Sequence, residues 1–349
     1  MMVRRQNIFL LTILTCLCIT GCVGQEISPS SNTEMTVPEV IAPSPVRQEE
    51  ERTPVCFSPR ELLPFVFTPD SAGLMVRELN GVQLIDLQSG QEQAFFSSPK
   101  SIFSAALSPN GETLAWSLEG GPVQLVLVSN QRILHTLEGH TDTVYDLQFS
   151  PGGEFLFSAS HDGWVRVWNV KKGTLLPSIQ AGGEVLGIGV SPDGKTLATI
   201  PGDGPVQLWS LAEDKVIKNL GGTGGYDTSD AHFSPDGRYL ATDLATGIFM
   251  WRISDGQLIW NEVKNSMAVA YSSDGQFLAF SNIDEDNIVT LASPDGAQII
   301  RTIDDMQGPV WELFFAPNSK LLAATDGIEI HIWQVSDGKL LYIGKPDCS

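Results

Sequence analysis

Short runs of alternating apolar and polar residues, separated by turns rich in Gly, Pro and Asp, fill the chain from about residue 60 to residue 343. Between residues 144 and 179, four such runs follow one another: Val144–Phe149, Glu154–Ser160, Val165–Trp168 and Leu175–Ile179. Asp162-Gly163 is a typical hairpin turn between the second and third runs. Because side chains alternate between the two faces of a β-strand, this pattern predicts four antiparallel strands and no helix.

The same unit recurs along the chain with a period of about 41 residues. One landmark is a turn, found at Thr68-Pro69-Asp70, Ser108-Pro109-Asn110-Gly111, Ser150-Pro151-Gly152-Gly153, Ser191-Pro192-Asp193-Gly194, Ser234-Pro235-Asp236-Gly237, Ser272-Ser273-Asp274-Gly275 and Ala316-Pro317-Asn318-Ser319. A second landmark ends the third strand of each unit, at Ile85, Val126, Trp168, Trp209, Trp251, Leu291 and Trp333. Seven repeats of four strands predict an all-β protein, a seven-bladed β-propeller of four-stranded antiparallel sheets.

Units of this length with Trp at the end of the third strand resemble WD-repeat β-propellers, and the resemblance covers nearly all of a domain placed at residues 56–348. The family's Gly-His pair occurs once, at Gly139-His140, and no Trp is followed by Asp. The resemblance implies a structural tetrad in the third repeat, formed by His140, a serine (Ser158 or Ser160), Asp162 and Trp168. We expect the other six blades to hold by apolar packing, and the last repeat to supply its own fourth strand, Leu340 to Ile343.

The first residues are typical of an export signal. Two arginines precede the apolar run Ile8–Ile19, which is too short to span a membrane, and the run ends in Ile19-Thr20-Gly21-Cys22. This sequence resembles the bacterial lipoprotein box, which implies removal of residues 1–21 and lipidation of Cys22; a plain signal peptide is the alternative. Residues 22–55 are rich in Ser, Pro, Glu and Thr and predict a disordered tether. The expected location is the cell envelope, outside the cytoplasm, with membrane association through the lipid anchor alone.

The cysteines that remain after this cleavage stand at the two ends of the propeller domain. Of five in the chain, Cys16 and Cys18 leave with the signal and Cys22 carries the lipid, so Cys56 and Cys348 are left. Disulfides persist outside the cytoplasm, and this pair is therefore a candidate disulfide. Two free thiols are the alternative.

Charge limits the choice of partner. The chain has 21 Lys and Arg residues against 41 Asp and Glu residues, a net charge of −20, which argues against nucleic acid and against anionic lipid surfaces. In WD-repeat proteins the loops entering each blade and the turns before each third strand form the usual binding face. Here these segments carry many acids: Glu119, Glu138, Asp142, Asp162, Glu184, Asp203, Asp227, Asp230, Asp284, Glu285, Asp286, Asp304, Asp305 and Asp326. We expect protein partners with a basic surface; simple solubility is the alternative.

Motifs that resemble catalytic or ligand-binding chemistry do not carry it. Residues 189–196 match the nucleotide-binding pattern GxxxxGK[ST], but they fall in the recurring turn and precede a strand, so ATP is not expected. No histidine stands at metal-ligand spacing from another, and the acidic run Asp284-Glu285-Asp286 lacks the spacing of a calcium loop, although weak cation binding there is an alternative. We expect no cofactor, no metal and no catalytic residue.

Aromatic and polar residues near the channel mouth refine the functional prediction. Trp164, Tyr226 and the acids Asp284, Glu285 and Asp286 are the candidate partner-binding residues, whereas Trp311 is expected to pack between blades. The sequence therefore predicts a lipid-anchored, non-enzymatic scaffold that binds proteins through an acidic face. One alternative is a hydrolase or lyase whose acid–base groups are Asp146, His232 and Glu312, which otherwise only face channel water. Another is a carbohydrate or cell-wall binder that uses Trp164 and Tyr226.

Overall fold

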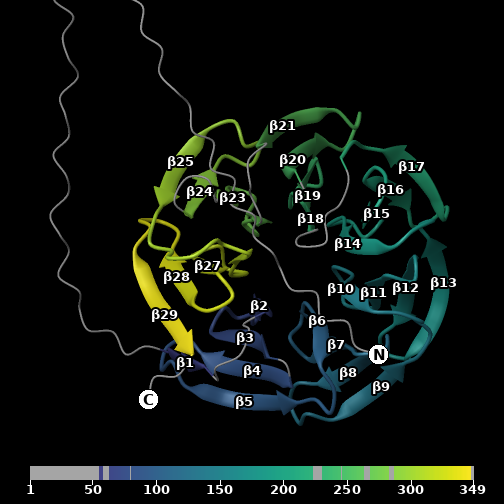
Figure 1. Cartoon of the computed structure of the whole chain (residues 1–349), viewed down its shortest axis with the longest axis horizontal. Coiled ribbons are helices and arrows are strands. Elements are labelled where there is room, and N and C mark those ends of the chain that lie inside the picture. Colours follow the sequence, from purple (N-terminus) through teal and green to yellow (C-terminus); the bar gives the residue numbers. More distant parts are fainter. Residues whose placement is uncertain are drawn as a thin grey trace, which may run out of the picture. The chain divides into compact units, whose positions relative to one another are not determined.

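Seven antiparallel sheets are arranged around a common centre (Figure 1). The structure is a computed structural model, and it describes residues 55–57, 63–78, 80–222, 230–244, 246–262, 268–282 and 287–346. All regular elements in these ranges are strands, so the predicted seven-bladed β-propeller is confirmed. No helix in these ranges has the length and apolar character needed to cross a membrane.

Each sheet, here called a blade, contains four strands in chain order from the centre outward. Blade 1 consists of β2 (Leu63–Phe67), β3 (Gly73–Glu78), β4 (Gly81–Asp86) and β5 (Glu92–Ser97), and blade 2 of β6 (Ile102–Leu107), β7 (Thr113–Leu118), β8 (Val123–Leu127) and β9 (Ile133–Leu137). Blade 3 consists of β10 (Val144–Phe149), β11 (Phe155–Ser160), β12 (Trp164–Asn169) and β13 (Thr174–Gln180). Blade 4 consists of β14 (Val185–Val190), β15 (Thr196–Pro201), β16 (Gln207–Ser210) and β17 (Lys215–Asn219).

Blades 5 to 7 follow the same order, and blade 7 gains a further strand. Blade 5 consists of β18 (Ala231–Phe233), β19 (Tyr239–Leu244), β20 (Gly247–Arg252) and β21 (Leu258–Glu262), and blade 6 of β22 (Val269–Tyr271), β23 (Leu278–Asn282), β24 (Ile288–Ala292) and β25 (Ile299–Ile303). Blade 7 consists of β26 (Glu312–Phe315), β27 (Leu321–Thr325), β28 (Ile330–Gln334) and β29 (Leu340–Pro346), and β1 (Val55–Phe57) lies outside β29.

The ring closes through the N-terminal strand, in a way the sequence did not indicate. The last repeat supplies its own fourth strand, β29, as expected. In addition β1 pairs with β29 in parallel, with Val55 opposite Gly344 and Cys56 opposite Lys345. Residues from the two ends of the domain therefore lie side by side at the outer edge of blade 7.

The hydrophobic core lies between the blades rather than at the centre of the ring. Seven clusters of buried side chains each join two neighbouring blades. One of them closes the ring, because Phe67 and Leu74 of blade 1 pack in the same cluster as Ala323 and Ile332 of blade 7. Alternation on each strand thus buries side chains against the blades on both sides, which holds the inner strands at fixed positions.

The recurring turn is stabilised by its own side chains. In blade 4 the Ser191 hydroxyl donates to Asp193 and accepts from the Thr196 N–H, while Asp193 accepts from the Lys195 N–H. The last turn residue has a positive φ, as in Gly194 at 68°, a conformation that favours glycine. In blades 1 and 7 a serine stands there instead, Ser71 at 60° and Ser319 at 57°. The hydroxyls of both accept from the turn of the preceding blade, at Asn318 N–H and Asp274 N–H respectively.

Candidate functional site

The tetrad residues of blade 3 meet at one end of the sheet. The turn between β11 and β12 carries Asp162, and the loop leading to β10 carries His140. Asp162 Oδ2 lies 2.8 Å from His140 Nδ1, and His140 Nε2 lies 2.7 Å from the Ser158 hydroxyl. The Trp168 indole N–H donates to the same hydroxyl at 2.8 Å. Ser158 is therefore the serine of this network.

Ser160, the other serine considered, has a different role. Its hydroxyl donates to the Asp142 carbonyl and accepts from the Asp162 N–H, so it fixes the turn rather than the tetrad. Burial lowers the pKa of His140, although Asp162 opposes the effect. Burial raises the pKa of Asp162, but the Thr141 N–H and His140 more than offset it and the net shift is downward. A neutral imidazole that donates to a carboxylate satisfies every hydrogen bond in this network.

The expectation that the other blades hold by apolar packing alone is wrong for three of them. The indole N–H of Trp209 donates to Thr199 in blade 4, and that of Trp251 donates to Thr242 in blade 5. In blade 7 the indole N–H of Trp333 donates to Asp305. A buried indole N–H needs a partner, and a threonine hydroxyl or a loop carboxylate supplies it where no serine is present.

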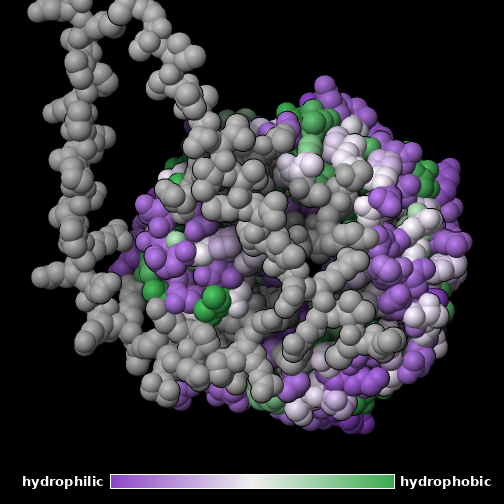
Figure 2. Space-filling model, viewed as in Figure 1, coloured by the Kyte–Doolittle hydropathy of each residue, from purple (hydrophilic) through white to green (hydrophobic). Residues whose placement is uncertain are grey.

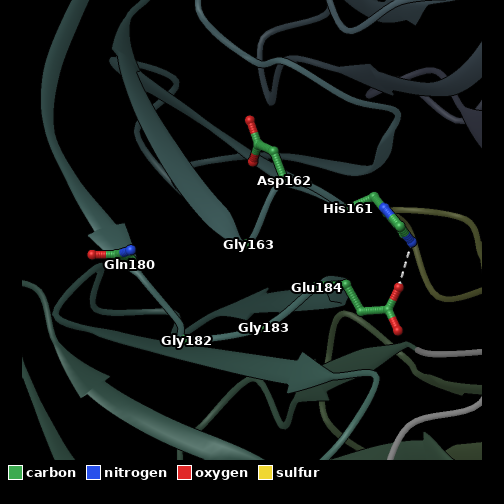
Figure 3. A pocket seen from close by; sticks show the side chains of 7 residues that line it. All are labelled: His161, Asp162, Gly163, Gln180, Gly182, Gly183 and Glu184. Atoms are coloured by element: carbon green, nitrogen blue, oxygen red, sulfur yellow. Dashed lines mark ion pairs between the residues drawn. The ribbon is translucent and has the colours of Figure 1, made fainter.

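A hollow of about 240 Å³ opens beside the tetrad, between blades 3 and 4 (Figure 3). It is lined by His161, Asp162, Gly163, Gln180, Gly182, Gly183 and Glu184. His161 Nε2 lies 2.6 Å from Glu184, and its Nδ1 lies 3.2 Å from Asp142. Figure 3 shows the His161 and Glu184 side chains pointing toward each other. Two carboxylates thus hold an imidazole that is 42% exposed, in a hollow that three glycines also line.

Tyr145 lies beside this hollow, in contact with His161. Its ring lies edge-on to that of His161, with 6.1 Å between centroids, and its side chain is 40% exposed. Burial, and the negative charges of Glu184 and Asp142, raise the pKa of its hydroxyl. The pairing of β10 with β11 shifts register between Val144 and Asp146, which makes Tyr145 the bulged residue. A bulge re-aims a side chain, and here the ring is left exposed.

Trp164 is placed less favourably for binding than the sequence indicated. Its backbone N–H donates to Asp162, and the Arg166 guanidinium lies 5.7 Å from the centre of its ring. That ring face is therefore not open to a partner or a sugar. Trp311, expected to pack between blades, is 37% exposed instead. The sequence missed His161 and Tyr145. It placed Glu184 among the acids of the expected binding face, but it did not indicate that this side chain contacts His161 of the neighbouring blade.

Asp146, His232 and Glu312 belong to inner strands, and each of them interacts electrostatically with Asp230. Burial raises the pKa of Asp146 to about 7, and Asp230 adds to the effect. Burial also raises the pKa of Glu312 well above its usual value, with Asp230 and Asp146 adding to it and Arg77 opposing it. Burial lowers the pKa of His232, against the attraction of Asp230. The Asp146 carboxylate accepts from the Ile188 N–H of β14 at 2.9 Å.

Several predicted site residues lie outside the described residues: Cys22, Tyr226, Asp284, Glu285, Asp286 and Cys348. Asn282 ends β23 and Ile288 begins β24, and the acidic run lies between them in the sequence. For Cys56 the structure gives the backbone position in β1.

Known proteins match parts of the chain. The WD domain, G-beta repeat family model matches residues 131–169, the segment that holds all four tetrad residues. WD repeat-containing protein SL1-17 of Schistosoma mansoni is 30% identical over 54% of this chain and 64% of its own length. Apoptotic protease-activating factor 1 of Rattus norvegicus is 26% identical over 53% of this chain. Pre-mRNA-processing factor 19 of Bos taurus is 29% identical over 40% of it.

The matched segments make up less than two thirds of each relative, at 18% of the apoptotic factor and 29% of the pre-mRNA-processing factor. Together with the seven blades, the matches support a WD-repeat propeller. They suggest a scaffold for protein–protein interaction, because WD-repeat propellers commonly bind protein partners.

Proposed function

We propose that this protein is a non-enzymatic WD-repeat scaffold, lipid-anchored in a bacterial envelope outside the cytoplasm, and that it binds a protein partner with a basic surface. The interface is the entry face, defined as the side of the ring formed by the loops into each first strand and by the turns between second and third strands. The observation that carries this proposal is the hollow beside Tyr145, where Asp142 and Glu184 flank an exposed His161.

The chemistry of the entry face fits a basic protein partner. An exposed tyrosine beside two carboxylates combines an aromatic anchor with charge that attracts Lys and Arg side chains. Among the coloured residues on the face seen in Figure 2, hydrophilic ones are the most widespread, and hydrophobic ones show as small separate patches. A polar face with isolated anchors suits a transient interface better than a permanent hydrophobic one.

The rigid tetrad lies directly under this surface. Asp162 lines the hollow and is also held by His140 and the Thr141 N–H, so the turn that presents His161 is fixed by a buried network. A preorganised surface loses less conformational entropy when it binds.

Affinity capture from native membranes tests the interface. The full-length lipoprotein is crosslinked mildly in its own membranes and compared with Asp142→Asn/Glu184→Gln. The matched control is Glu154→Gln/Glu213→Gln, which removes the same charge from exposed turns on the opposite side of the ring. We expect one specific protein with wild type and control, and at least a tenfold loss with the entry-face variant.

A further variant, Asp284→Asn/Glu285→Gln/Asp286→Asn, tests the acidic run predicted from the sequence. Equal capture by all four proteins would place the interface elsewhere on the ring. Capture of no specific protein would contradict the scaffold and direct attention to the enzyme and carbohydrate alternatives.

Metabolic labelling tests the anchor. We expect radioactive palmitate to label the wild-type protein and not Cys22→Ser, and the variant to leave the membrane fraction. Equal labelling of both proteins would contradict lipidation at Cys22.

A further inference from the structure

An exposed apolar pair stands on the entry face of blade 7. Ile328 lies in the turn between β27 and β28 and is 62% exposed, and Trp311 directly precedes β26 and is 37% exposed. The corresponding turns of blades 2, 3 and 4 expose no large apolar side chain. Turns favour Gly, Pro, Asn, Asp and Ser, so turn geometry does not account for a β-branched residue at this position.

The two residues belong to one continuous patch. A Cβ atom at Gly327 would lie 3.8 Å from the Trp311 ring, so the ring lies beside the turn that carries Ile328. The Trp311 N–H also donates to the carbonyl of Thr325, the last residue of β27, at 2.9 Å. Figure 2 shows a small hydrophobic patch on the side of the ring where Figure 1 places blade 7. Trp311, Gly327 and Ile328 are here called the blade 7 patch.

Hydrogen bonds hold the turn of this patch in one conformation. Asp326 Oδ1 accepts from the N–H groups of Ile328 at 2.9 Å and Glu329 at 2.7 Å. The Gly327 N–H donates to the Thr325 hydroxyl at 3.0 Å, and the φ of Gly327 is 84°, a conformation that favours glycine. The Ile328 side chain is therefore presented by a fixed backbone, which loses less conformational entropy on binding.

The segments that carry the patch are negatively charged. A Cβ atom at Gly308 would lie 2.7 Å from Asp326 Oδ2, so the loop of residues 304–310 packs against the turn. This loop and residues 325–329 contain no Lys or Arg and four acids, of which the two in the loop are exposed: Asp304, Asp305, Asp326 and Glu329. Negative charge around an apolar pair attracts Lys and Arg side chains, and it repels anionic lipid headgroups.

We propose that the blade 7 patch binds a segment of the partner protein in which an aliphatic or aromatic side chain is flanked by Lys or Arg. The apolar side chain packs on Trp311 and Ile328, and the flanking cations face the carboxylates of the loop and the turn. Trp is among the residues that contribute most to binding energy at interfaces, whereas charges at the rim add specificity and speed of association.

This inference rests on the proposed function and gives the partner a second contact. Figure 1 shows blade 7 across the ring from blades 3 and 4, which hold the hollow beside His161. A partner that uses both contacts therefore spans the entry face.

The first test uses the full-length protein in lipid nanodiscs and three synthetic peptides. Lys-Leu-Leu-Lys-Arg combines both features, Lys-Ser-Ser-Lys-Arg keeps the charge alone, and Glu-Leu-Leu-Glu-Glu keeps the apolar residues with the opposite charge. We expect calorimetry to show that the first peptide binds at least tenfold more tightly than either control, with an affinity that falls as salt rises. Equal binding of the first two peptides, or no binding of the first at millimolar concentration, would overturn the proposal.

Two serine variants locate the binding site of the first peptide. Ile328→Ser removes the exposed anchor, and Ile299→Ser is the matched control, because Ile299 is 65% exposed on the outer strand β25. We expect the affinity to fall about tenfold in the former and to stay unchanged in the latter. Equal losses would show unspecific adhesion and overturn the proposal. Trp311→Ala is a further variant, and where it does not fold, Ile328→Ser decides the question.

Photo-crosslinking in intact cells identifies what covers the patch. The photoreactive amino acid p-benzoylphenylalanine replaces Ile328, or Ile299 in the control, and mass spectrometry sequences the crosslinked segment. We expect a protein adduct from position 328 alone, through a segment with Lys or Arg beside an apolar residue. An adduct with lipid or with a second copy of this chain would overturn the proposal and assign the patch to the membrane or to self-association.

Failure of this inference is distinguishable from failure of the proposed function. Capture of a partner that Asp142→Asn/Glu184→Gln loses and Ile328→Ser keeps, without binding of the first peptide, would leave the scaffold intact and reject the blade 7 patch. Binding of the first peptide without capture of any protein would retain the patch and reject the scaffold.

Discussion

At the residue scale, Ser158 holds the most consequential position. It is fully buried, and its hydroxyl serves both the His140 imidazole and the Trp168 indole. Its loss leaves two buried polar groups without a partner, and each such group costs about 1–3 kcal/mol. Ser160 stands two residues later and only stabilises a turn. The same substitution at these two positions therefore distinguishes the contribution of the tetrad to stability from that of the turn.

We expect Ser158→Ala to lower the free energy of unfolding by about 2–3 kcal/mol, and Ser160→Ala by about 1 kcal/mol. Urea denaturation followed by Trp fluorescence measures both. Equal losses would mean that the tetrad adds nothing to the apolar packing of blade 3.

The contribution of Asp146 to stability decreases as pH rises, whereas that of an ordinary hydrogen-bonded carboxylate increases. Its folded pKa is about 7, whereas an unfolded Asp titrates near 3.9. The folded state therefore binds more protons between these values, and this contribution to stability is full below pH 4 and is lost as pH rises to 7. Asn at this position still accepts from the Ile188 N–H without a charge.

We expect Asp146→Asn to be more stable than wild type at pH 8 and to lose less stability between pH 5 and pH 8. Asp193→Asn is the contrasting variant, because the hydrogen bonds from Ser191 and Lys195 lower the pKa of Asp193 and its contribution is present above pH 4. Urea denaturation at several pH values compares the two. The same pH dependence in Asp146→Asn and wild type would contradict the buried-carboxyl argument.

At the element scale, the recurring turns join neighbouring blades as well as neighbouring strands. Ser71 adopts a φ of 60°, and its hydroxyl accepts from the Asn318 N–H of blade 7. An L-residue in this conformation costs about 1–2 kcal/mol, and the hydrogen bond offsets part of that cost. The two serines that replace glycine are those of blades 7 and 1, where the ring closes.

We therefore expect Ser71→Ala to destabilise the protein by about 1 kcal/mol, because it keeps the Cβ atom and loses the acceptor. Ser71→Gly loses both the strain and the hydrogen bond, so it should stay close to wild type. Thermal unfolding of the three proteins measures the difference. A larger loss in the Gly variant than in the Ala variant would contradict this account of the turn.

At the scale of the whole molecule, the period of two landmarks was enough to predict seven blades of four strands, because each blade is a local unit of about 41 residues. Contacts between segments that are far apart in the sequence leave no periodic pattern, so they could not be predicted in this way. The pairing of β1 with β29 joins three residues to a strand almost 290 residues away. The hollow likewise combines His161 and Glu184 from separate segments, and Tyr145 of a third segment contacts the His161 ring. Blades 4 and 5 have a threonine where the tetrad has a serine, so the sequence did not predict the indole hydrogen bonds of these two blades.

Ring closure gives the last prediction, a disulfide between Cys56 and Cys348. The parallel register sets Cys56 opposite Lys345, which is 348 − 345 = 3 residues before Cys348. Three extended residues span about 10 Å, whereas the Cα atoms of a disulfide lie within about 7 Å, so the bond requires the chain to turn back after Pro346. The register therefore places Cys56 beside Lys345, three residues before Cys348 in the sequence, and does not by itself show a bond.

In protein isolated without reductant, we expect alkylation to modify neither Cys56 nor Cys348 until the bond is reduced. Closing a loop of 348 − 56 = 292 residues stabilises by about 5 kcal/mol in the chain-entropy model. Cys56→Ser and Cys348→Ser should each lose this stabilisation, and their stability should equal that of reduced wild type. Alkylation of both thiols in the native protein would contradict the disulfide. The ring would then be closed by the pairing of β1 with β29 and by the hydrophobic core between blades 7 and 1.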